Sequence, residues 1–236
     1  MHALLRTITK WLLSLYYDVT VIGWKNIPVD EQIIAVSNHH AVVDSYALPA
    51  FLERNLVFLS KEEYFALPGL KGWLLRTLLT GRAVPVNRAS AISGVRALRE
   101  LKTVLEHGGD VGLHPEGTRV PEGYVCKGLP GAVSLAWDTG VKILPVAILG
   151  SAQANRPGHW LPRFRAKITV IIGQPMKFEP PWLFGRVKMA RAMQQEVQTR
   201  QLMQRIAQLG GLKYVDKPPA QVKAEIAAKK QLDETE

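Results

Sequence analysis

Short apolar runs alternate with helix-length stretches along most of the chain, and this alternation limits the fold more than any other feature of the sequence. Such alternation is typical of a sheet whose strands are connected by helices packed on its faces. We therefore predict an α/β fold, a single domain with a central mixed, mostly parallel sheet flanked by helices. The predicted strands are residues 19–23, 33–37, 56–59, 82–86, 110–113, 143–149 and 168–172. The predicted helices are residues 44–54, 70–79, 89–107, 131–139 and 186–209.

The 236 residues suit one domain, and a hydrophobic fraction of 47% is enough for a core. Gly210 and Gly211 end the last predicted helix, and a Lys-Pro-Pro linker follows at residues 217–219. We predict three parts: an N-terminal amphipathic helix at residues 1–17, a main domain at 18–210 that contains the predicted sheet, and a polar C-terminal tail at 211–236.

The N-terminal segment is apolar but is interrupted by Arg6 and Lys10. It is too short to span a bilayer, which takes about 20 apolar residues. Its large apolar residues recur at helical spacing and share one side: Leu4, Leu5, Ile8, Trp11, Leu12 and Leu15. This pattern predicts an amphipathic helix that contacts a membrane surface. The alternative is a helix that packs on the domain's own core.

A formal net charge of +10 implies an anionic partner, such as nucleic acid, an acidic membrane surface or a phosphate-bearing substrate. The basic residues are spread along the chain, and no helix-turn-helix, zinc-finger or RNA-binding aromatic signature is present, so we expect no nucleic-acid partner. Cys126 is the single cysteine and is interpreted as structural. No Cys/His cluster has zinc-ligand spacing, so no metal is expected.

The first candidate site follows the predicted strand at residues 33–37. His39 and Asp44 are five residues apart, which in one helix would separate them by about 140°. They can meet if His39 lies in the strand-to-helix turn and Asp44 in the first turn of the helix. The carboxylate would then hold the imidazole's tautomer and raise its basicity. A His-Asp pair without its own nucleophile suits an enzyme that activates a substrate hydroxyl. His40 is a competing candidate for the base.

Two further segments carry candidate ligands. Residues 113–119 follow a predicted strand, and there Gly117 permits an unusual turn while Glu116 and Arg119 either pair with each other or grip a polar substrate. The Arg119 guanidinium matches phosphate geometry. A strand at 82–86 leads to Arg88, which is either a second phosphate ligand or a solvated residue before the next helix.

Together these segments resemble the 1-acyl-sn-glycerol-3-phosphate acyltransferase family, whose members carry four ordered blocks. The block Asn-His-x-x-x-x-Asp matches Asn38, His39 and Asp44, and the block Phe-Pro-Glu-Gly-Thr-Arg matches Pro115 to Arg119, with His114 in the place of the usual aromatic residue. Of the other two blocks, one matches Gly81 to Arg88 poorly and the other matches Leu144-Pro145-Val146. The lysine-glycine pair that usually follows the Phe-Pro-Glu-Gly-Thr-Arg block is Lys127-Gly128. The resemblance covers residues 17–174.

The resemblance implies a fatty acyl transfer from an acyl thioester, acyl-CoA or acyl-carrier protein, to the hydroxyl of 1-acyl-glycerol-3-phosphate, giving phosphatidic acid. It implies His39 as base and Asp44 as its partner, with no further cofactor. It also implies a substrate site for the phosphate and glycerol of the lysophospholipid, formed by Arg88, Glu116, Gly117, Thr118, Arg119 and Lys127. Together with the positive charge, it places the protein on the cytoplasmic face of the cell membrane, bound to an anionic surface.

Two other functions stay open on the sequence alone. The same chemistry can act on another membrane acceptor, such as a glycolipid, an aminolipid or a mannosylated phosphoinositide. A protein of a different class, a non-catalytic basic lipid-binding module, has the same charge.

Overall fold

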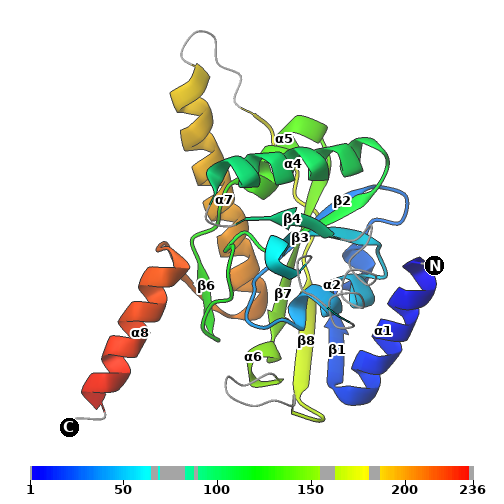
Figure 1. Cartoon of the computed structure of the whole chain (residues 1–236), viewed down its shortest axis with the longest axis vertical. Coiled ribbons are helices and arrows are strands. Elements are labelled where there is room, and N and C mark those ends of the chain that lie inside the picture. The colour runs from blue at the N-terminus through cyan, green and yellow to red at the C-terminus, as the bar shows by residue number, and fades with distance from the viewer. Residues whose placement is uncertain are drawn as a thin grey trace.

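The structure is a computed structural model that describes residues 2–64, 69, 83–87, 90–154, 163–180 and 187–233. Within these residues, seven strands form one sheet in the order β1-β8-β7-β2-β5-β3-β4 (Figure 1). Neighbouring strands are parallel except for β7 and β8, which are antiparallel. The strands are β1 (Asp18–Ile22), β2 (Ile33–Ser37), β3 (Leu56–Lys61), β4 (Ala83–Val86), β5 (Asp110–Leu113), β7 (Lys142–Leu149) and β8 (Lys167–Ile172).

The central strands are buried on both faces because helices cover the sheet from both sides. In β2, Ile34 and Val36 pack into one core cluster while Ile33 and Ala35 pack into the other. The first cluster lies under α4 (Ala91–Glu106), α5 (Gly131–Thr139) and α7 (Val187–Gly210), and the second under α1 (His2–Tyr16) and α2 (Asp44–Leu52) (Figure 1). The continuous apolar runs of these strands follow from this double burial.

The predicted fold class is confirmed: a central mixed, mostly parallel sheet flanked by helices, with a helix at the N-terminus. The helix predicted at residues 70–79 lies outside the described residues. Two short strands escaped prediction, β6 (Tyr124–Cys126) and β9 (Lys213–Val215), which form a separate parallel pair. Three residues are too few to show an alternating pattern. The remaining elements are the short helices η1 (Trp24–Asn26), η2 (Glu62–Tyr64) and α6 (Ser151–Ala154), and α8 (Pro219–Asp233).

The segment predicted as a polar tail contacts the rest of the protein. Strand β9 pairs with β6, and Val222 of α8 packs against Val120 and Cys126. Residues beyond 210 therefore help to hold the loop that follows β5. The predicted division into three parts stays a prediction.

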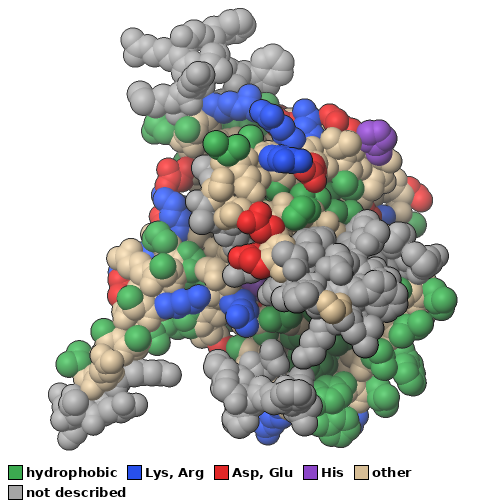
Figure 2. Space-filling view, viewed as in Figure 1, with side chains coloured by type: hydrophobic (Ala, Val, Ile, Leu, Met, Phe, Trp, Pro, Cys, Tyr) green, Lys and Arg blue, Asp and Glu red, His purple; other side chains and the backbone are tan. Residues whose placement is uncertain are grey.

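Helix α1 packs on the domain with one side only. Leu13 and Tyr16 contact the second core cluster, Arg6 donates a hydrogen bond to Asn55, and Lys10 pairs with Glu53. The opposite side exposes a row of large apolar residues, with exposed fractions from 43% to 66%: Leu4, Ile8, Trp11, Leu12 and Leu15. Figure 2 shows hydrophobic side chains gathered where α1 lies in Figure 1. None of the described helices is both long and apolar enough to cross a bilayer.

Candidate active site

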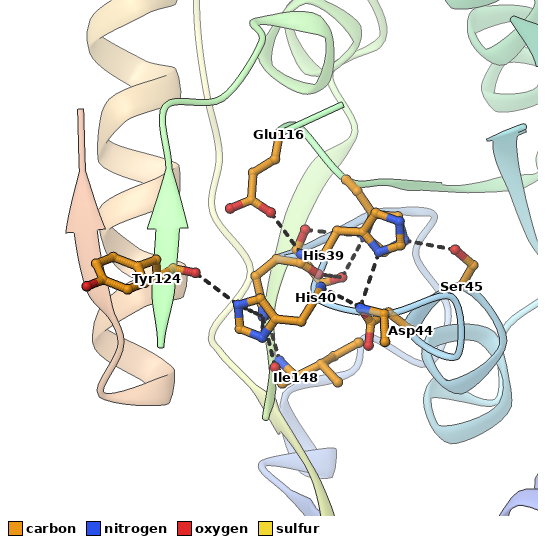
Figure 3. A network of polar contacts seen from close by, with 11 residues as sticks. His39, His40, Asp44, Ser45, Glu116, Tyr124 and Ile148 are labelled. Atoms are coloured by element: carbon orange, nitrogen blue, oxygen red, sulfur yellow. Dashed lines mark hydrogen bonds and ion pairs between the residues drawn. The ribbon is translucent and has the colours of Figure 1, made fainter. Parts of the chain in front are cut away.

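His39 and Asp44 meet just beyond the carboxyl end of β2, near the centre of the sheet. The strand ends at Ser37, and α2 begins at Asp44, so His39 lies in the loop between them and Asp44 in the first turn of the helix. His39 Nδ1 lies 3.2 Å from Asp44 Oδ2 (Figure 3). This is the placement in which the five-residue spacing allows the two side chains to touch.

Asp44 is a fully buried carboxylate whose Oδ2 atom collects three contacts. Besides His39, the backbone N–H groups of His40 and Ala41 donate to Oδ2, each at 2.7 Å. Burial raises the pKa of Asp44, but the hydrogen bonds from His39, Ser151 and the Ala41 N–H, with the charge of His39, outweigh it and leave the pKa below its ordinary value. Asp44 is therefore charged at neutral pH.

These contacts assign the proton positions on His39. A carboxylate only accepts hydrogen bonds, so Nδ1 carries the hydrogen that points to Asp44, and the Nε2 atom of the neutral ring holds the lone pair. No residue that the structure describes forms a hydrogen bond with Nε2. The His39 side chain is 10% exposed. Nε2 is thus the atom that can take a proton from a substrate hydroxyl.

His40, the competing candidate, has both ring nitrogens in use. Nε2 lies 2.9 Å from the carbonyl oxygen of Tyr124 and so donates to it, while Nδ1 lies 3.3 Å from the side-chain amide of Asn38 (Figure 3). A ring held in this way connects the loop to β6 and has no free lone pair. The geometry therefore favours His39 over His40 as the base.

Asn38 connects this loop to the end of β7. Its side chain accepts from the Ile148 N–H and donates to the Ile148 carbonyl, both at 2.8 Å. The chain then turns at Gly150, whose φ of 77° and whose approach to Lys167 leave no room for a Cβ atom. The turn brings the buried Ser151 to Asp44.

Ser151 and Asp44 hold the two unsatisfied polar atoms of this site. Asp44 Oδ1 and Ser151 Oγ are both fully buried and neither reaches a partner at full hydrogen-bond geometry among the described residues. The Ser151 hydroxyl nevertheless lowers the pKa of Asp44 from beside the carboxylate. Ser151 followed the fourth block in the sequence, but nothing in the sequence connected it to Asp44.

Glu116 holds the backbone of His39. Its carboxylate accepts from the His39 N–H at 2.8 Å (Figure 3) and from the Cys126 N–H at 2.9 Å. The Val120 N–H donates to the His39 carbonyl at 2.8 Å. Burial raises the pKa of Glu116 to about 8 despite these donors. The residue was predicted to contact substrate, whereas here both of its oxygens bind the chain itself.

The turn after Glu116 leads to the surface. Gly117 has a φ of 67°, and its N–H donates to the His114 carbonyl at 3.0 Å. Thr118 is half-buried and Arg119 is exposed. No ion pair joins Arg119 to any residue within the described part of the chain, so its guanidinium presents an uncompensated charge two residues beyond the turn.

Of the two other residues predicted to bind substrate, Arg88 and Lys127, the structure describes only Lys127. Arg88 lies outside the described residues. The Lys127 side chain is 42% exposed, and its ammonium lies 2.5 Å from Glu196 of α7, so its charge is compensated within the protein. The buried thiol of Cys126 has its pKa raised to about 11, first by burial and then by Glu116, which suits a structural residue. Among the described residues, no three His, Cys, Asp or Glu side chains gather as a metal site.

Fold and site together define an α/β protein with a His-Asp pair at the carboxyl edge of its sheet and no described hydroxyl or thiol at His39 Nε2. The model of the Acyltransferase family matches residues 18–149. The chain therefore belongs to the Acyltransferase family, as its motifs indicated.

Similar proteins of known name are also acyltransferases. The chain is 32% identical over 158 residues to a 1-acyl-sn-glycerol-3-phosphate acyltransferase of Chlamydomonas reinhardtii, covering 66% of this chain and 46% of that protein. It is 30% identical to a chloroplastic 1-acyl-sn-glycerol-3-phosphate acyltransferase of Arabidopsis thaliana, covering 68% and 44%. The chain thus spans less than half the length of these two relatives.

One solved structure is similar to this chain in both fold and sequence. It is the 1-acyl-sn-glycerophosphate (LPA) acyltransferase PlsC from Thermotoga maritima, with a TM-score of 0.61 and 30% identity over 87% of this chain and 80% of that chain.

Proposed function

We propose that this protein transfers a fatty acyl group from an acyl thioester to the free hydroxyl of 1-acyl-glycerol-3-phosphate, giving phosphatidic acid. The observation that carries the proposal is the buried contact between His39 Nδ1 and Asp44 Oδ2, which leaves Nε2 as the proton acceptor. The names of the similar proteins support the choice of acceptor.

The reaction follows from the proton positions. His39 Nε2 takes the proton of the acceptor hydroxyl while the hydroxyl oxygen attacks the thioester carbonyl carbon. The buried charge of Asp44 stabilises the imidazolium that forms. The tetrahedral intermediate collapses as the C–S bond breaks, and the proton held by His39 passes to the leaving thiolate. An ester and a free thiol result, and no residue of the protein becomes acylated.

The acceptor's phosphate is proposed to bind near the turn after β5. Arg119 is exposed and has no ion-pair partner among the described residues, which suits a phosphate ligand. Gly117 and Thr118 shape the same turn, and Arg88 and Lys127 are proposed as further contacts. Glu116 acts on the acceptor only indirectly, because it fixes the His39 backbone.

The acyl donor is proposed to be acyl-CoA or acyl-carrier protein, with no other cofactor. Both donors are anionic, as is the acceptor, and the net charge of +10 favours all three. The reaction above needs only acid–base chemistry and an activated thioester, so no step requires a metal.

We propose that the protein works on the cytoplasmic face of the cell membrane as a peripheral protein. The support is the exposed apolar row of α1, since a helix with one apolar side and one side packed on a domain can lie in the interface plane. The acceptor and product are lipids, and the positive charge favours an anionic bilayer.

The test is product formation by the purified protein in vesicles. Labelled acyl-CoA or acyl-carrier protein is supplied with 1-acyl-glycerol-3-phosphate, and phosphatidic acid is separated by chromatography. Phosphatidic acid from either donor supports the proposal and identifies the donor. Transfer only to glycolipid or aminolipid acceptors would replace the acceptor and keep the chemistry. Vesicle binding without turnover on any acceptor would indicate a lipid-binding module.

A further inference from the structure

His114, which the proposed reaction does not use, stacks on the base. The ring centroids of His39 and His114 are 4.3 Å apart, and the ring planes differ by 8°. The two residues are far apart in the sequence and meet because β2 and β5 are neighbouring parallel strands whose carboxyl ends share one edge of the sheet. His39 is therefore held at its edge by Asp44 and on one face by a second imidazole.

The ring of His114 is fixed in turn by two serine hydroxyls. Its Nδ1 atom lies 3.0 Å from Ser37 Oγ and 3.4 Å from the Ser37 carbonyl, and its Nε2 atom lies 3.3 Å from Ser45 Oγ. Ser37 Oγ already donates to the Asn38 carbonyl at 3.0 Å, so it accepts from His114. The hydrogen of the neutral ring is thus on Nδ1, and Nε2 accepts from Ser45.

A third ring supports the far side of the stack. The ring centroid of Phe58, in β3, lies 5.7 Å from that of His114, with an interplanar angle of 26°. Gly112 makes room for Phe58, because a Cβ atom there would come within 2.3 Å of the phenyl ring. The three rings therefore stack with His114 between Phe58 and His39, and packing between strands of the sheet holds Phe58 in place.

We propose that His114 is a positioning residue that sets the plane of the His39 imidazole by stacking on it, with its own plane fixed by Ser37 and Ser45. The inference rests on the proposed role of His39 as the base. His114 need not exchange a proton with substrate, because both of its nitrogens contact serine hydroxyls.

The physical reason is the freedom of an imidazole to rotate about the bond that joins it to Cβ. Asp44 fixes one atom of the ring through a contact of 3.2 Å, and rotation of the ring about that contact still moves Nε2. The flat ring of His114, whose centroid lies 4.3 Å from that of His39, removes that rotation. Misplacing a catalytic atom by about 1 Å can cost a factor of about 100 in rate.

The experiment compares His114→Phe with His114→Leu in the acyl-transfer assay. Phenylalanine keeps a flat stacking surface and loses both serine contacts, whereas leucine keeps apolar volume without a ring. We expect kcat to stay within about threefold of wild type for His114→Phe and to fall about 10- to 100-fold for His114→Leu. The KM for the acceptor is expected to change less than about twofold in both, because neither variant alters the exposed Arg119. His114→Met, with a flexible side chain of similar size, replaces leucine if that variant does not fold.

Three results bear on the inference. A kcat near wild type in His114→Phe together with a reduced kcat in His114→Leu supports it. Equal losses in His114→Phe and in His114→Leu overturn it, because His114 would then act through its own nitrogens. Unchanged kcat in His114→Leu also overturns it. His39→Ala run alongside separates the two proposals, since an active His39→Ala variant would refute the base itself.

Discussion

Replacing Asp44 with asparagine removes the charge behind His39 while keeping its hydrogen bonds. All three donors converge on Oδ2, at 3.2 Å from His39 Nδ1 and 2.7 Å from the N–H groups of His40 and Ala41. An amide oxygen in the Oδ2 position can accept all three. The amide nitrogen then takes the place of Oδ1 beside the Ser151 hydroxyl, which can accept a hydrogen bond.

The expected loss can be worked from the 3.2 Å contact between His39 and Asp44. Two unit charges at that distance attract by about 5 kcal/mol at an effective dielectric constant of about 20. Losing this stabilisation of the imidazolium in the transition state corresponds to a fall of about 10³ to 10⁴ in kcat/KM.

The assay is the initial rate of thiol release from acyl-CoA with saturating acceptor. Asp110→Asn is the matched control, because Asp110 is also a buried carboxylate, accepts from the Ile33 N–H at 2.8 Å and pairs with Arg54 at the amino end of β5. It should lower stability and leave turnover near wild type. A loss below about tenfold in Asp44→Asn, in a variant that folds normally, would mean that the charge of Asp44 is not used in the reaction.

Three further predictions concern stability, the second oxygen of Asp44 and the membrane surface. Ser151→Ala should lower kcat by about tenfold, since Asp44 Oδ1 loses its neighbouring hydroxyl. Thr199→Val removes another buried hydroxyl that has no hydrogen-bond partner among the described residues, and it should leave kcat unchanged. Glu116 has its pKa raised to about 8, so the folded state keeps a proton that the unfolded state releases; its contribution to stability is present below about pH 4.5 and falls, by at most about 1.4 kcal/mol per pH unit, as the pH rises to about 8. Denaturant unfolding of Glu116→Gln across this range should lack that slope, and an identical slope in both proteins would contradict it. Trp11→Glu in α1 should weaken sedimentation with anionic vesicles about tenfold or more while Ile92→Glu, at an exposed apolar residue of α4, should not; equal binding of both would count against α1 as the membrane contact.

The sequence predicts the central sheet well because its strands are buried on both faces. Residues 33–37 and 110–113 were placed without error, since Ile33, Ile34, Ala35 and Val36 are all fully buried and leave an uninterrupted apolar run. The pair β6 and β9 was missed because each strand has three residues and its partner lies far away in the chain. Such strands depend on tertiary contacts, which no local pattern records.

The site was predictable where a local spacing decides the geometry and not where distant segments meet. His39 and Asp44 are five positions apart, a strand ends before His39 and a helix begins at Asp44, and this spacing is enough to predict their contact. The positions of Glu116 at the His39 backbone, of Ser151 at Asp44 and of His114 on the His39 ring depend on the order of β2, β5 and β7 in the sheet. Of these three contacts, only that of His114 had a signal in the sequence, because a histidine stands there in place of the usual aromatic residue.

The central claim is that His39 is the base of an acyl transfer, and the most direct measurement is the rate at which His39→Gln makes phosphatidic acid from acyl-CoA and 1-acyl-glycerol-3-phosphate. His107→Gln, at an exposed histidine at the end of α4, is the control. We expect the wild type and the control to turn over equally and His39→Gln to be slower by a factor of about 10³ or more while still binding vesicles. Turnover by His39→Gln within about tenfold of wild type would contradict the account.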